Sequence, residues 1–321
     1  MFLQKAGTGE NQWWRYLLTT VIVIAGVLIG QTPLFLIVNY RATALGLGQD
    51  EIMEMAGSLD LSPIGIGLNG TLLLALLAFI GGLLALWLCV VHLHKKPFRL
   101  MITPARAIHW QKIFFGFGLW IGLAVLAELA FYAIYPMNYT FRFDPVQFMG
   151  LVAVSILLLP LQTSFEELFF RGYFMQGISL IAPFRWIPLV LTSAAFGLMH
   201  WMNPEVQAFG AGLTMVYYIG VGLFLGIVTL MDDSLELALG VHAATNIFGA
   251  MFVTFDDAAL KTAALFHVGV VDMGGMLIAF FVCAAVFIWV VSKKYQWRDW
   301  TKWYGKIERQ QIEPAERFVT D

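Results

Sequence analysis

The sequence predicts an all-α, polytopic transmembrane helical bundle with about eight spanning helices. Of its 321 residues, 60% are hydrophobic and only 12% are charged, and the chain contains 27 Phe and 11 Trp. The mean hydropathy of +0.77 lies well above that of soluble domains, and the apolar residues form long runs between short polar segments. We therefore expect a multi-pass integral membrane protein with the lipid bilayer as a partner, and we expect no nucleic-acid partner.

Each predicted span is a run of about 20 mostly apolar residues, which is the length that crosses a bilayer as a helix. The first run is too long for the core of a signal peptide and lacks a convincing small-residue cleavage site, so we interpret it as a retained span. The fourth meets no helix breaker before Pro183 and should continue to about residue 180. The predicted spans are 17–39, 71–92, 113–135, 147–169, 187–203, 211–231, 235–255 and 269–292.

The basic residues of the loops predict the orientation in the membrane. The loop 93–112 contains several Lys and Arg residues and no acid, whereas the loop after the first span is acidic. Because cytoplasmic loops carry an excess of Lys and Arg, the loop 93–112 should be cytoplasmic. With eight spans, both termini then lie in the cytoplasm. After the last span, Trp297, Trp300 and Trp303 recur at helical spacing, which predicts an interfacial helix at the headgroup level.

Ionisable side chains inside the spans are the candidates for function. Inserting such a group costs about 3 kcal/mol, so each one implies a partner, a water-filled cavity or a function. Cys89 and Cys283 also lie in spans, and they support neither a disulfide framework nor a metal cluster. The polar groups in the spans are Glu128, Glu166, Glu167, Arg171, His200 and His242, with Asn246 as a companion.

The spacing of these residues separates their roles. Glu167 and Arg171 are four residues apart and lie on one helical face, which predicts an ion pair, whereas Glu166 is rotated by about 100° and can point elsewhere. His242 and Asn246 are also four residues apart. For Glu128, which has no companion motif, two readings stay open: a structural partner for some Ser, Thr or Arg, or a cavity-lining group.

A carboxylate and an imidazole in a site of low dielectric constant can together deprotonate water at neutral pH. A second His and an Asn supply N–H donors for the oxygen of a tetrahedral intermediate, worth about 3 kcal/mol per donor. The set therefore predicts hydrolysis of a peptide bond within the membrane. The sequence has no HExxH zinc motif, no glycine-flanked Ser with a downstream His, and no pair of Asp residues inside spans.

Three motifs now carry a family resemblance. Glu166-Glu167-x-x-x-Arg171, Phe196-x-x-x-His200 and His242-x-x-x-Asn246 follow one another on consecutive apolar segments. They resemble the motifs of the CAAX protease and bacteriocin-processing family (CPBP, also called Abi), which are intramembrane glutamate endopeptidases. The stretch FEELFFRGYF is similar to the first family motif even between its charges. The resemblance covers about residues 148–255.

The resemblance implies a role for each motif residue and an eight-helix fold. Glu166 would be the general base and His200 its partner in activating water, while His242 and Asn246 would form the oxyanion site. Glu167 and Arg171 would be a supporting pair, with Phe196 completing the second motif. No cofactor is implied. The substrate would be a peptide or a membrane protein, with prenylated CAAX proteins and bacteriocin-type peptides as the alternatives.

This reading predicts three regions along the chain. Residues 1–146 hold three spans and their loops, residues 147–255 hold a catalytic core of four spans, and residues 256–321 hold the eighth span and a cytoplasmic interfacial tail. Two other functions remain open. A zinc protease would use His200, His242 and one of the glutamates as ligands. A non-catalytic scaffold, regulator or proton-relay transporter would use the buried acids differently.

Overall fold

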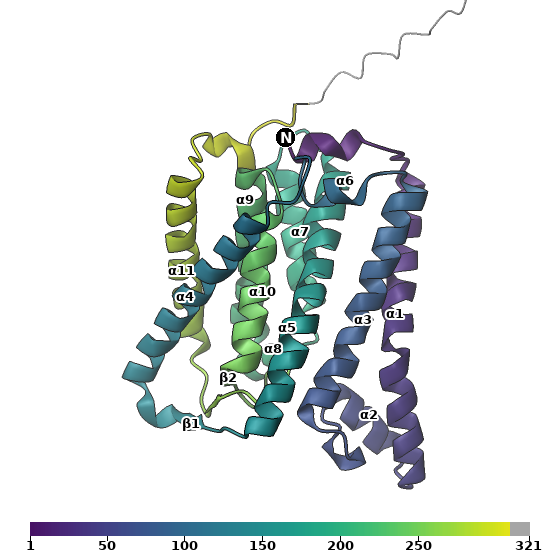
Figure 1. Cartoon of the computed structure of the whole chain (residues 1–321), viewed down its shortest axis with the longest axis vertical. Helices are drawn as coiled ribbons and strands as arrows, with labels where there is room; N and C mark the ends of the chain where they lie inside the picture. Colours follow the sequence, from purple (N-terminus) through teal and green to yellow (C-terminus); the bar gives the residue numbers. More distant parts are fainter. Residues whose placement is uncertain (309–321) are drawn as a thin grey trace, which may run out of the picture.

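The computed structural model describes residues 1–308 and consists of helices packed side by side, as the sequence predicts (Figure 1). Each of the eight predicted apolar runs coincides with a helix. Six helical segments are long and apolar enough to cross a bilayer, and the protein is an integral membrane protein. The main helices are α1 (Trp13–Ala44), α3 (Leu68–Leu88), α4 (Trp110–Ile134), α5 (Pro145–Glu167), α7 (Trp186–Met199), α9 (Ala211–Asp232), α10 (Glu236–Met251) and α11 (Met273–Lys294).

Among residues 1–308, six helical segments have the length and composition of spans, so the predicted count of about eight is corrected to about six. Helix α7 has 14 residues and α10 has 16, so at 1.5 Å per residue they are about 21 and 24 Å long. Both are shorter than the hydrocarbon core of about 30 Å. The hydrophobic runs were longer than the helices because apolar residues continue into the segments that follow them. Both short helices carry residues of the predicted site.

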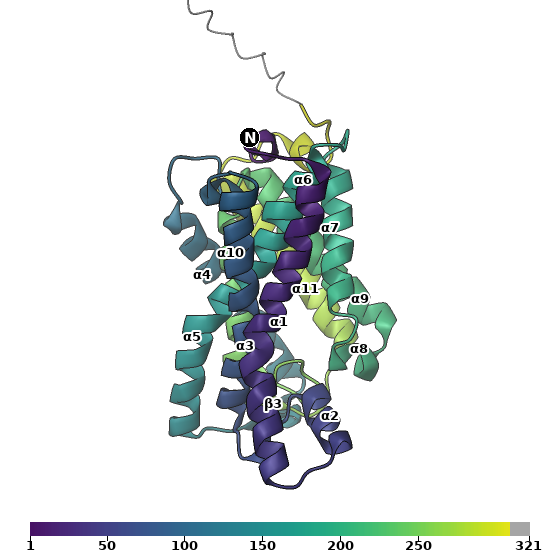
Figure 2. The same cartoon turned by 90° about the vertical axis from the view of Figure 1, so that its right-hand side faces the viewer.

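Close contacts between small residues determine how the helices pair. The Cβ of a residue at Gly81 on α3 would lie 2.1 Å from the Gly26 carbonyl oxygen on α1. A Cβ at Gly240 on α10 would lie 2.1 Å from the Ile113 carbonyl oxygen on α4. Since apolar surface alone does not drive helices together in lipid, small residues that let backbones approach are the typical contacts of membrane helices. Figure 2 shows α1 lying along the outside of α3.

A small sheet lies at the end of the bundle opposite the chain's N-terminus (Figures 1 and 2). Its strand order is β1-β3-β2, with β1 antiparallel and β2 parallel to β3. Glu205, on the short helix α8 (Pro204–Phe209), accepts a hydrogen bond at 2.7 Å from the Ala259 amide in the segment between β2 and β3. The strands are β1 (Tyr139–Phe141), β2 (Val253–Thr254) and β3 (Phe266–Val268).

The N-terminal segment and the last described residues meet at the other end of the bundle. The Phe2 amide donates to Asp233 at 3.3 Å, and Lys302 forms an ion pair with the same aspartate at 2.6 Å. The predicted interfacial helix is reduced to one 3₁₀ turn, η7 (Trp300–Trp303), and Trp297 is buried because it packs in the core. The part of the tail from 309 to 321 lies outside the described residues.

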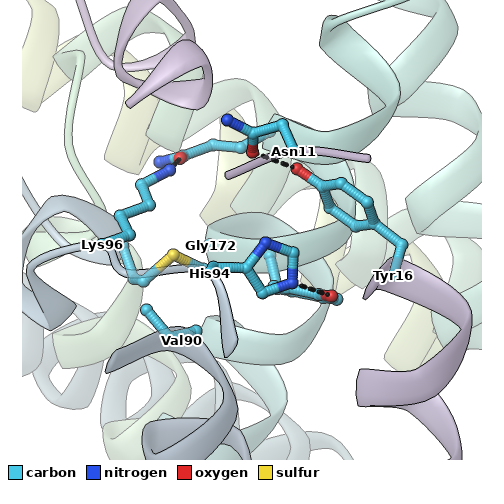
Figure 3. A pocket seen from close by; sticks show the side chains of 9 residues that line it. Asn11, Tyr16, Val90, His94, Lys96 and Gly172 are labelled. Atoms are coloured by element: carbon cyan, nitrogen blue, oxygen red, sulfur yellow. Dashed lines mark hydrogen bonds between the residues drawn. The ribbon is translucent and has the colours of Figure 1, made fainter. Parts of the chain in front are cut away.

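A small polar pocket at this end joins the N-terminal segment to the helix that carries the first motif (Figure 3). The Tyr16 hydroxyl donates to Asn11 at 2.9 Å. A ring nitrogen of His94 lies 2.8 Å from the Tyr173 hydroxyl, and Lys96 donates to the Gln176 side chain at 2.6 Å. Tyr173 and Gln176 follow the EExxxR motif on the same helix. Their hydrogen bonds with His94 and Lys96 therefore hold the end of that helix in place.

Candidate functional site

The first motif lies within one continuous helical rod from Pro145 to Ser179, made of α5, the π-helical segment η6 (Leu168–Phe174) and α6 (Met175–Ser179). Asp144 caps its start by accepting hydrogen bonds from the first free backbone amides. The prediction that this helix continues to about residue 180 is confirmed. The π-helical segment follows Glu167 directly, and such segments occur frequently at functional sites.

Glu167 and Arg171 form the ion pair that their spacing predicted. The Nη1 atom of Arg171 lies 2.7 Å from Glu167 Oε1, and both side chains are fully buried. Arg171 Nη2 also donates to the Gly222 carbonyl oxygen on α9 at 3.1 Å, and the guanidinium lies 4.5 Å from the centre of the Phe196 ring. These contacts link α5 to α9 and α7, so the pair is a structural centre of the bundle.

His242 on α10 lies between the two adjacent acids. Its Nδ1 atom is 2.8 Å from Glu167 Oε1, and its Nε2 atom is 3.5 Å from Glu166 Oε2. The carboxylate of Glu166 therefore contacts His242, whereas the carboxylate of Glu167 contacts both His242 and Arg171. The structure thus brings Glu166, Glu167, Arg171 and His242 together in one buried group.

Two side-chain amides, those of Gln162 and Asn246, hold the Oε1 atom of Glu166 through successive hydrogen bonds. Gln162 Nε2 donates to Glu166 Oε1 at 2.8 Å, and Asn246 Nδ2 donates to Gln162 Oε1 at 2.9 Å. Asn246 thus reaches Glu166 through Gln162, which the motif reasoning did not include. The signal for Gln162 was its position one turn before Glu166, since residues four apart share a helical face.

His200 lies directly after the end of α7, beside the rings of Phe196 and Tyr218. Its Nδ1 atom is 2.8 Å from the Phe196 carbonyl oxygen, and its ring stacks on Tyr218 at 4.2 Å. Among the described residues no hydrogen bond joins His200 to Glu166. Phe196 connects the two histidines, with ring centres 4.7 Å from His200 and 5.9 Å from His242. Tyr218 was missed because a Tyr in an apolar helix has no distinctive pattern.

Glu128 does not join this group. It accepts a hydrogen bond at 2.5 Å from the Tyr139 hydroxyl and lines a separate cavity between α4, α10 and α11. The cavity-lining reading fits this position, whereas the structural-partner reading named Ser, Thr or Arg and the partner in the structure is Tyr139. Within residues 1–308, no group of three or more His, Cys, Asp or Glu side chains is placed to hold a metal ion.

The chain is similar to known proteins over the segment that carries the site. Residues 145–248 match the family model described as type II CAAX prenyl endopeptidase, Rce1-like. The chain is also similar to the uncharacterized protein YyaK of Bacillus subtilis (strain 168), at 29% identity over 252 residues, which cover 77% of this chain and 80% of the relative. No solved structure matches the chain.

The matched segment contains all three motifs, so the family resemblance predicted from them is confirmed. The family match supports a CAAX-type intramembrane protease, which is a hydrolase. The individual roles of the site residues and the boundaries of the three predicted regions remain predictions.

Proposed function

We propose that this protein is an intramembrane endopeptidase in which Glu166 activates the water that attacks a peptide bond. One observation carries the proposal: Glu167 is neutralised by Arg171, whereas Glu166 is bonded to neutral Gln162 and faces His242 across 3.5 Å. A carboxylate that is free of a strong ion pair and close to an imidazole is suited to accept a proton.

The hydrogen bonds of the two histidines indicate which ring nitrogen carries the proton. In His200 the Nδ1–H donates to a backbone carbonyl, so Nε2 of the neutral ring is free to accept a proton. In His242 the Nδ1–H donates to Glu167. When Nε2 carries a proton as well, it is a donor on the side of the ring that faces Glu166.

The reaction follows from these donors and acceptors. Glu166, assisted by His200, takes a proton from water as the water oxygen bonds to the carbonyl carbon of the substrate. Nε2–H of His242 and the second N–H of the Asn246 amide stabilise the negative oxygen of the tetrahedral intermediate. When the C–N bond breaks, the proton held by Glu166 passes to the leaving nitrogen, which restores the carboxylate.

The proposed substrate is a peptide or protein with a lipidated cysteine near its C-terminus, in line with the family's description as a CAAX prenyl endopeptidase. The test is proteolysis by the purified chain in detergent, with a farnesylated CAAX peptide and the same peptide without its lipid. We expect cleavage of the lipidated peptide, with loss of activity in His200→Ala and Asn246→Ala. Equal cleavage of both peptides would favour a bacteriocin-type peptide substrate.

A zinc protease is the competing mechanism, and we propose that the reaction needs no metal. The support for this proposal is that, among residues 1–308, no three His, Cys, Asp or Glu side chains are placed to share a metal ion. Dialysis against a strong chelator, with the residual zinc measured, should leave the rate unchanged. A loss of activity that added zinc restores would contradict the metal-free mechanism.

A further inference from the structure

A second cavity lies apart from the proposed catalytic site, between α4, α10 and α11 near the sheet. Its volume is about 280 Å³, which exceeds the roughly 150 Å³ of an engineered apolar cavity that binds benzene. Most of its wall is hydrocarbon or aromatic. The large apolar side chains that line it include Trp120, Phe131, Phe248, Phe255, Met276 and Phe280.

The charged groups of this cavity are all of one sign. Glu128 and Asp272 line it, and no Lys, Arg or His is among its lining residues within the part of the chain that the structure describes. The Tyr139 hydroxyl bonds Glu128 Oε1 at 2.5 Å, and Asp272 uses Oδ1 to accept from the Gly275 amide at 2.9 Å. Each carboxylate therefore keeps one oxygen for a further donor.

The cavity and the catalytic group use different residues of α10. Thr245 and Gly249 line the cavity, whereas His242 and Asn246 on the same helix bond Glu167 and Gln162 on α5. The carboxylate of Glu128 takes no part in the proposed hydrolysis. Glu128 is half-buried in a mostly apolar wall, and the cost typical of acids inside membranes requires another explanation.

We propose that this cavity binds an amphiphile with an ammonium head and a hydrocarbon body. The apolar wall takes up the hydrocarbon, since ligand cavities are mostly apolar with a few polar groups that orient the ligand. The two carboxylates attract a positive head that can donate hydrogen bonds, and nearby aromatic rings also favour a cation. A carboxylate head would be repelled, and an alcohol would gain no charge attraction.

The test is equilibrium dialysis of radiolabelled octylamine, octanoate and octanol against the purified full chain in neutral detergent, with empty micelles subtracted. We expect octylamine to bind one per chain, at least tenfold more tightly than the other two. Glu128→Gln should weaken octylamine binding about tenfold and leave octanol unchanged. Tyr139→Phe keeps the charge and should retain octylamine binding.

Two leucine variants provide a matched steric control. A Cβ at Gly249, which lines the cavity, or at Gly122 on α4, which does not, would meet no atom within 4 Å. Gly249→Leu should therefore abolish octylamine binding, and Gly122→Leu should bind it like the wild type. Equal binding of the three amphiphiles, or unchanged octylamine binding in Glu128→Gln or Gly249→Leu, would overturn the proposal. If Glu128→Gln does not fold, the contrast between Gly249→Leu and Tyr139→Phe decides.

Discussion

Glu166 and Glu167 are adjacent in the chain but have different electrostatic surroundings. Glu167 is fully buried and contacts both Arg171 and His242, so its charge is balanced inside the protein. Glu166 is hydrogen-bonded by a neutral amide and has His242 at 3.5 Å. The difference arises because adjacent helical residues point about 100° apart. One acid therefore stabilises the bundle, while the other is available for chemistry.

Glu167→Gln should destabilise the fold because it leaves the fully buried Arg171 guanidinium without its counter-charge. Removing one partner of a buried ion pair costs about 3–5 kcal/mol. Thermal unfolding in detergent should show a large loss of stability. Glu166→Gln is the matched control and should change stability by much less, since Gln can still accept from Gln162. Opposite behaviour of the two variants would mean that the roles are exchanged.

The free energy of unfolding should depend on pH through Lys96, which lies at the end of the bundle that holds the N-terminal segment. Its side chain is buried against Gln176, and burial lowers the pKa of Lys96 from its ordinary value of 10.5 to about 8. Between these values the unfolded chain binds more protons than the folded chain. The free energy of unfolding should therefore rise as the pH increases from about 8 to 10.5.

The measurement is the unfolding temperature of the wild type and Lys96→Met between pH 7 and pH 10. Lys96→Met should lack the rise, because it has no ammonium to desolvate. Lys95→Met is the matched control, since that side chain is 67% exposed and pairs with Glu10 at the surface, where ion pairs contribute little. A difference between wild type and Lys96→Met that stays constant with pH would contradict the assignment.

At the scale of elements, the site depends on helices that approach closely enough to bring polar groups together. Helix α10 carries His242 and Asn246, and its Gly240 lies against the backbone of α4. Helix α5 carries Gln162, Glu166 and Glu167 on the opposite side of the site. The short distance between His242 and both acids therefore requires that α10 is held at its present depth and rotation.

Gly240→Ala should disturb this arrangement. The added methyl group would lie 2.1 Å from the Ile113 carbonyl oxygen, so α4 and α10 must separate. Overpacking of this kind costs about 1–3 kcal/mol, and we also expect loss of proteolysis because His242 moves. Gly249→Ala on the same helix adds a methyl group into open space and should behave like the wild type. Unimpaired stability and activity in Gly240→Ala would show that the close contact is unimportant.

The sequence predicted the helices and the motif residues but could not predict how the motifs face one another. Apolar runs and residues four apart depend only on local geometry, so the ion pair of Glu167 with Arg171 was predictable. The contact of His242 with both acids depends on the relative rotation of α5 and α10, which no spacing reports. The place of Gln162 one turn before Glu166 was readable from the sequence, but its hydrogen bond to Asn246 on α10 was not.

At the scale of the whole molecule, both described ends of the chain meet at one end of the bundle, as Phe2 and Lys302 contact the same aspartate. The span count was not predictable because hydrophobic runs do not mark where α7 and α10 end. The number of spans is even whether or not α7 and α10 are counted as spans. An even number predicts that both described ends of the chain lie on one side of the membrane.

Labelling of single cysteines tests which side that is. In a background without Cys89 and Cys283, Lys95→Cys lies in the loop that the basic residues predict to be cytoplasmic. Asp256→Cys lies at the sheet end and replaces a side chain that is 86% exposed. A membrane-impermeant maleimide added to intact cells should label Asp256→Cys alone. Labelling of Lys95→Cys alone would reverse the orientation.

The central claim is that Glu166 activates water for peptide hydrolysis, and the turnover of purified Glu166→Gln tests it most directly. The substrate is one that the wild type cleaves, and both proteins are compared at equal folded concentration, checked by thermal unfolding. Removal of a general base should reduce the turnover number by at least about 100-fold, with the unfolding temperature close to that of the wild type. Wild-type turnover by the folded Glu166→Gln variant would contradict the account.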